Sequence, residues 1–105
     1  MKDIKISDLQ RLIKTLDNGN GTTEEYFYKL TEEVGELSKA IRKNIRLDKT
    51  DNIKGTIEEE LYDVLCYVFC IANSYNINLE QCMYMKEKLN AEKYNRKSIF
   101  DIEEE

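Results

Sequence analysis

The clearest indication of how this chain folds is residues 56–72, which read TIEEELYDVLCYVFCIA. Thr56 can cap a helix, and Glu59 three residues later completes a capping-box pattern ahead of a mostly apolar run. Between Leu61 and Ala72 the only charged residue is Asp63, and this run is well short of the roughly 20 residues that span a bilayer. We therefore predict a central helix over about 57–75, in a protein with no membrane span.

Further capping patterns on either side of this stretch predict three more helices. The caps and their partners three residues later are Ser7 with Gln10, Thr22 with Glu25, and Asn78 with Gln81. Each precedes apolar residues spaced by three and four. The full set of predicted helices is 8–16, 23–45, 57–75 and 79–94. With no alternating pattern typical of strands, we predict an all-α antiparallel four-helix bundle, ending in an acidic tail at 101–105.

Composition limits the possible functions. The 105 residues fit one domain over 1–105, and the absence of proline fits long helices. The absence of histidine excludes histidine-based catalysis, zinc fingers and di-iron sites built on Glu-x-x-His. A net charge of −5 argues against a nucleic-acid partner. Three cysteines and no signal-peptide pattern predict a reducing, cytoplasmic location, with Cys66 and Cys70 interpreted as core residues rather than metal ligands.

Two of the predicted helices carry pairs of acidic residues at i, i+3. The pairs are Glu33 with Glu36 and Glu60 with Asp63, and packing the two apolar stripes together would bring all four to one edge. Like charges about 4 Å apart repel by roughly 1–4 kcal/mol per pair, so such an edge needs a cation or raised pKa values. Oxygen ligands without histidine or cysteine favour Mg²⁺ or Mn²⁺.

A solvated acidic face is the simpler interpretation of part of this pattern. Glutamates in an EExxE pattern are typical of exposed helix faces, and acidic residues at 58–60 also favour the positive end of a helix. Asp63 is not explained in this way, because it lies beyond the first turn and among apolar residues.

At these motifs the chain resembles the MazG-like all-α nucleoside triphosphate pyrophosphohydrolases. The family signature is EExxE followed by ExxD on the next long helix, and here 32–36 and 60–63 are separated by 23 residues. The family also shows a basic segment downstream, matched here by Lys86, Asn90, Lys93 and Tyr94. The resemblance covers residues 22–97. Where the family often has proline after that aromatic residue, this chain has Asn95, and it lacks the Trp and His of pyrimidine-selective members, which leaves the base preference open.

The resemblance implies hydrolysis of a (d)NTP to a (d)NMP and pyrophosphate, with Mg²⁺ as cofactor and Mn²⁺ as a possible substitute. By carry-over, the metal ligands are Glu33, Glu36, Glu60 and Asp63, and Glu32 is a catalytic helper in the second shell or in positioning water. Lys86 and Lys93 would contact phosphates, Asn90 would bind sugar or phosphate, and Tyr94 completes that motif. Tyr67, one turn after Asp63, would wall the substrate site or pack in the core.

The central helix also predicts self-association. A helix that is apolar on all sides must be buried on all sides, so residues such as Phe69 and Cys70 are expected to project toward a second chain. We predict a homodimer or homotetramer; the alternative is that the first helix and the tail cover this face. Two other functions stay open: a non-catalytic nucleotide- or metal-binding regulatory bundle, and a helical interaction module without a ligand.

Overall fold

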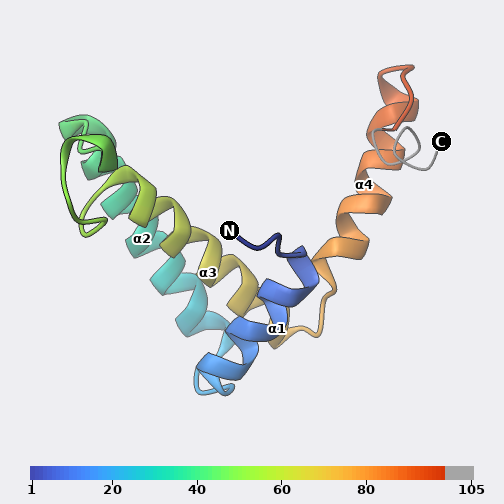
Figure 1. The fold of residues 1–105 in the computed structure, drawn as a ribbon. Coiled ribbons are helices and arrows are strands. Elements are labelled where there is room, and N and C mark those ends of the chain that lie inside the picture. The colour runs from blue at the N-terminus through green and yellow to red at the C-terminus, as the bar shows by residue number, and fades with distance from the viewer. Residues whose placement is uncertain (99–105) are drawn as a thin grey trace.

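The computed structural model describes residues 1–98, and helices are the only regular elements within that range. They are α1 (Ile6–Asp17), α2 (Thr23–Lys43), the short 3₁₀ helix η1 (Leu47–Lys49), α3 (Ile57–Ser74) and α4 (Leu79–Lys93) (Figure 1). The predicted all-α class with four main helices is confirmed, and each helix end lies within two residues of its predicted position. None of the helices in 1–98 is long and apolar enough to cross a membrane. The predicted acidic tail, 101–105, lies outside the described residues.

Local capping explains three of the four helix starts. At α2 the capping box is complete, because Thr22 and Glu25 each accept a backbone N–H from the other. Thr56 accepts from the backbone of Glu59 at 3.1 Å, and Asn78 caps α4 in the same way. The predicted cap at Ser7 is wrong. Helix α1 begins earlier, at Ile6, so Ser7 lies inside the helix, and Lys5 at the cap position makes no side-chain cap bond. The Gln10 side chain bonds instead to residues distant in sequence.

The α2–α3 pair forms the body of the molecule, and α1 lies across the half of α3 farther from the connecting loop (Figure 1). The buried cluster at this crossing is Ile13, Tyr26, Phe69 and Cys70. The Tyr26 hydroxyl donates to Asp17 and accepts from the backbone of Gly21, which ties the loop after α1 to α2. The expectation that Phe69 and Cys70 project toward a second chain is therefore wrong, because α1 covers them within one chain.

Helix α4 leaves this body. It packs mainly against α1 at its base and then extends away from the α2–α3 pair, as the orange ribbon in Figure 1 shows. Among the residues of α4 only Ala91 is buried. Within the described part of one chain, the four helices thus do not close into a bundle. Large apolar side chains stay exposed on all four helices, and those on α2, α3 and α4 include Phe27, Val34, Ile41, Leu61, Tyr62, Leu65, Met83, Met85 and Leu89.

Candidate metal centre

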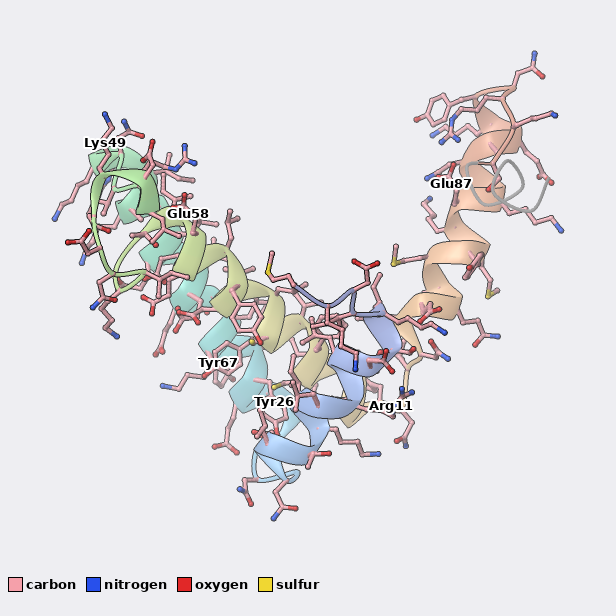
Figure 2. The ribbon with its side chains drawn as sticks, viewed as in Figure 1. Arg11, Tyr26, Lys49, Glu58, Tyr67 and Glu87 are labelled. Atoms are coloured by element: carbon pink, nitrogen blue, oxygen red, sulfur yellow. The ribbon has the colours of Figure 1, made fainter. Side chains whose placement is uncertain are left out.

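Helices α2 and α3 bring three acidic side chains together. One carboxylate oxygen from each of Glu33, Glu60 and Asp63 lies within 4.8 Å of the other two. Glu60 and Asp63 share a face of α3 because they are three residues apart, and the packed α2 adds Glu33 from the other side. Glu60 and Asp63 lie on α3 between Glu58 and Tyr67, two residues that Figure 2 labels.

Glu60 is the most buried member of this carboxylate group, with 8% of its surface exposed. Its Oε2 atom is buried without a hydrogen-bond partner, which is rare for a polar atom in a folded protein. Burial raises the pKa of Glu60, and the hydrogen-bonded carboxyl of Glu33 and the negative charge of Asp63 raise it further. Three crowded carboxylates, one of which has a buried oxygen without a hydrogen-bond partner, fit a divalent cation that all three would coordinate.

The turn before α3 holds the group in place. Thr56 is fully buried, and its hydroxyl donates to the carbonyl of Ile53 at 2.6 Å while capping the helix. Gly55 takes a left-handed conformation with φ +77°, and its N–H donates to Glu59 at 2.8 Å. These bonds fix the first turn of α3, from which Glu60 projects, and Asp63 follows one turn later.

Lys54 in this turn was not singled out by sequence analysis. Its positive charge lowers the pKa of Asp63, whereas burial, the largest effect, and the charge of Glu59 raise it, so the net shift is upward. The sequence could have pointed to this lysine, because it directly precedes Gly55 and Thr56, where α3 begins. A side chain at that position lies beside the first turns of α3.

The other predicted site residues of α2 and α3 lie around the group. Glu36 is exposed one turn beyond Glu33 and is not a member of the group. Glu32 is also exposed and pairs with Lys29, whose Nζ lies 3.3 Å from its Oε2. Tyr67 packs against the core cluster, and its pKa is raised by burial and next by the charge of Glu33, which places it at the edge of the group.

The predicted substrate contacts of α4 lie elsewhere. Lys86, Asn90, Lys93 and Tyr94 are on α4 or at its C-cap. This helix points away from the α2–α3 pair, and Figure 2 shows Glu87 on it well separated from Tyr67. Lys93 stacks on its neighbour, with Nζ 5.4 Å from the centre of the Tyr94 ring. One described chain therefore does not bring these side chains to the carboxylate group.

An all-α fold with a partly buried carboxylate group shared by two long helices defines a helical protein with a site suited to a divalent metal. The sequence profile of the MazG nucleotide pyrophosphohydrolase domain matches residues 21–98. The chain belongs to this family, as the resemblance in its acidic motifs indicated.

Known proteins agree with this assignment. Two crystal structures of iMazG from Vibrio DAT 722 are similar to the chain with a TM-score of 0.72 each. One is 47% identical and covers 83% of this chain and 98% of its own; the other is 46% identical and covers 89% and 100%. The uncharacterized protein YpjD of Bacillus subtilis (strain 168) is 35% identical over 83 residues, which are 77% of this chain and 74% of that protein.

Proposed function

We propose that the protein is a metal-dependent nucleoside triphosphate pyrophosphohydrolase that converts a (d)NTP to a (d)NMP and pyrophosphate. The observation that carries the proposal is the group of Glu33, Glu60 and Asp63 with its orphaned buried oxygen, in a chain of the MazG family. The all-oxygen donor set favours Mg²⁺, with Mn²⁺ as an alternative. When bound there, the metal would neutralise phosphate charge and lower the pKa of a bound water.

The acidic residues of the chain have different roles in this proposal. Glu33, Glu60 and Asp63 hold the cation, and Glu36 joins them as a fourth ligand from the next turn of α2. Glu32 lies outside the group and helps to orient the attacking water. Tyr67 walls the side of the site that faces the core and limits access of bulk water to the α-phosphate. A cation held by these residues would supply positive charge to the substrate's phosphate oxygens.

The active unit in this proposal is a homodimer or homotetramer. Lys86, Asn90, Lys93 and Tyr94 contact the substrate from α4, and α4 points away from the carboxylate group of its own chain. Residues 86–97 contain five basic and two acidic residues, whereas α3 contains four acidic residues and no basic one. This charge complementarity, and the exposed apolar faces of α2, α3 and α4, support seating α4 on the acidic edge of a second copy.

A substrate panel tests the proposed reaction. Each ribo- and deoxyribonucleoside triphosphate is incubated with the protein and Mg²⁺, and the products are separated by ion-exchange chromatography. We expect a nucleoside monophosphate and pyrophosphate in equal amounts from at least one substrate. Nucleoside diphosphate with phosphate would point to a different bond being cut. If no substrate turns over and nucleotides still bind, the protein is instead a regulatory nucleotide-binding bundle.

We further propose a housekeeping role in the nucleotide pool of the cytoplasm. Three free cysteines fit a reducing compartment, and cleavage to a monophosphate removes a nucleotide from use by polymerases. Growth of a deletion strain in the presence of damaged or non-standard nucleosides, compared with the complemented strain, tests this role. Equal sensitivity of the two strains would contradict it.

A further inference from the structure

Helices α1 and α4 begin beside each other, and each supplies a hydrogen-bond partner to the start of the other. The backbone N–H of Leu79, the first residue of α4, donates to Oε1 of Gln10 on α1 at 3.2 Å. The backbone N–H of Ser7, in the first turn of α1, donates to Oε2 of Glu80 on α4 at 3.1 Å. A helix cannot satisfy these first amide groups itself, so the two helix starts cap each other.

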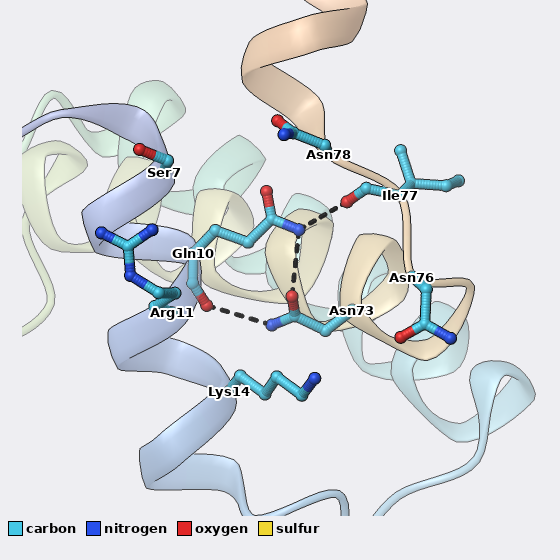
Figure 3. A pocket seen from close by; sticks show the side chains of 8 residues that line it. All are labelled: Ser7, Gln10, Arg11, Lys14, Asn73, Asn76, Ile77 and Asn78. Atoms are coloured by element: carbon cyan, nitrogen blue, oxygen red, sulfur yellow. Dashed lines mark hydrogen bonds between the residues drawn. The ribbon is translucent and has the colours of Figure 1, made fainter.

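Both polar atoms of the Gln10 carboxamide form hydrogen bonds in this arrangement. Its Nε2 donates to Oδ1 of Asn73 at 3.0 Å and to the carbonyl of Ile77 at 2.6 Å (Figure 3). Its backbone carbonyl accepts from Nδ2 of Asn73 at 3.2 Å. With the bond from Leu79, one residue of α1 joins the last turn of α3, the connecting turn and the first residue of α4.

Among the contacts within residues 1–98 of one chain, few others define where α4 points. Leu79 packs against the core cluster, but beyond its first turn the helix runs away from α1, α2 and α3 (Figure 1). A small tilt at the base is therefore amplified along the helix. With a rise of 1.5 Å per residue, Lys86 lies about 10 Å and Lys93 about 21 Å from Leu79, so a tilt of about 10° moves them by roughly 2 Å and 4 Å.

We propose that Gln10 is a positioning residue that sets the direction in which α4 leaves the core. Through α4 it places Lys86 and Lys93, and the larger lever arm makes Lys93 the more sensitive of the two. The effect on substrate rests on the proposed function, whereas the direction of α4 does not. Misplacing a substrate contact by about 1 Å can cost roughly a hundredfold in rate, so a shift of this size has a measurable effect.

Distance measurements test the direction of α4 without any substrate. Spin labels are attached at Lys39→Cys on α2 and Glu92→Cys on α4, both exposed positions, with Cys66→Ala and Cys82→Ser removing competing thiols. Burial raises the pKa of Cys70 to about 11, so this thiol stays unreactive at neutral pH. Dilution with excess unlabelled protein restricts double electron–electron resonance to distances within one chain.

We expect Gln10→Ala to shift or broaden the distance distribution by several ångströms. The matched control is Arg11→Ala, since Arg11 lines a cavity of about 240 Å³ together with Gln10 but pairs with Asp8 on its own helix. Gln10→Glu keeps the side-chain oxygen that accepts from the N–H of Leu79. Its distance distribution should therefore be intermediate between those of Gln10→Ala and Arg11→Ala. If Gln10→Ala does not fold, Glu80→Ala, which removes the reciprocal cap, decides the question by the same measurement. An unchanged distribution in the folded variant overturns the proposal.

Kinetic measurements then test whether the direction of α4 affects catalysis. We expect Gln10→Ala to lower kcat/KM for the best triphosphate by about tenfold or more, with Arg11→Ala near wild type. Lys93→Ala should cost less in the Gln10→Ala background than in the wild type, and Lys86→Ala should show a weaker coupling. Changed distances with unchanged kinetics would refute the placement of the lysines at the substrate. A wild-type protein inactive on every nucleotide would refute the proposed function and leave the distance test of Gln10 intact.

Discussion

The α2–α3 pair and the segment 86–97, which begins on α4, carry opposite net charge and are held in opposite ways. The pair holds Glu33, Glu60 and Asp63 between two helices that pack along their length. Helix α4 carries Lys86 and Lys93 and is held mainly at its base. Three carboxylates of like charge crowd together in the acidic part, and the basic part is mostly exposed within one described chain. In the proposed function a metal completes the first part and a second copy of the chain completes the other.

Removing a metal ligand should produce the largest effect on function. Asp63→Asn is expected to lower turnover by more than about a hundredfold at saturating Mg²⁺, because losing a ligand exceeds the loss seen for outer-shell partners. The metal-free variant should melt at the same or a higher temperature, since one crowded charge is gone. Glu36→Gln should behave likewise if Glu36 is the fourth ligand. Turnover and calorimetry measure both effects, with the exposed Glu24→Gln as control. Near-normal turnover in both variants would exclude this metal site.

A charge on the exposed face of α3 should break the assembly. Leu65 is 41% exposed, so Leu65→Glu leaves the fold of one chain intact but places an unpaired charge in the proposed interface. We expect the mass in light scattering to fall from two or four chains to one at micromolar concentration, with activity falling in parallel. Phe69→Glu is unsuitable, because Phe69 is buried under α1 and the variant would unfold.

The matched control for this variant is Thr50→Glu, an exposed position outside the helices. It should keep the wild-type mass. A wild-type mass of one chain that does not change on concentration would exclude the homodimer. In that case the exposed apolar side chains of α2 and α3 would need another partner.

A smaller effect is expected from removing a lysine of α4. Lys93→Ala should weaken the apparent affinity for a triphosphate by about tenfold, in line with the loss of one charge-assisted hydrogen bond, and affect a monophosphate less. Lys88→Ala, on the same helix but outside the predicted motif, serves as control. Equal losses for the tri- and monophosphate in calorimetric titrations would show that Lys93 is an ordinary surface residue.

The sequence was most informative where structure is local. The cap at Thr22 and the shared helix face of Glu60 and Asp63 depend on residues three apart, so spacing was enough to predict them. Ser7 failed as a cap because α1 begins one residue before it, and its expected partner Gln10 bonds to residues 63 to 69 positions away. The same long-range bonds give α4 its direction, which no local pattern encodes.

The metal-free carboxylate group should also make stability depend on pH. Burial raises the pKa of Glu60 and of Asp63 in the folded chain, so the folded state binds protons more tightly than the unfolded state. This contribution to stability is complete below the ordinary carboxyl pKa and is lost as the pH rises through the raised values. The lowered pKa of Glu58, which pairs with Arg46, acts in the opposite direction, but only below its ordinary value of 4.5.

Between pH 5 and pH 7.5 the metal-free protein should therefore melt at a lower temperature as the pH rises. Glu60 faces the acidic residues Glu33, Asp63 and Glu59, so no basic group counteracts the rise in its pKa. Lys54 counteracts only the rise in the pKa of Asp63. Mg²⁺ should reverse the trend, because it binds the deprotonated carboxylates and stabilises the folded state more at pH 7.5 than at pH 5. Calorimetry in chelator and in excess Mg²⁺ measures both slopes. Glu60→Gln should flatten the metal-free slope and Glu24→Gln should not; an equal slope in both variants would mean that the group is not crowded in solution.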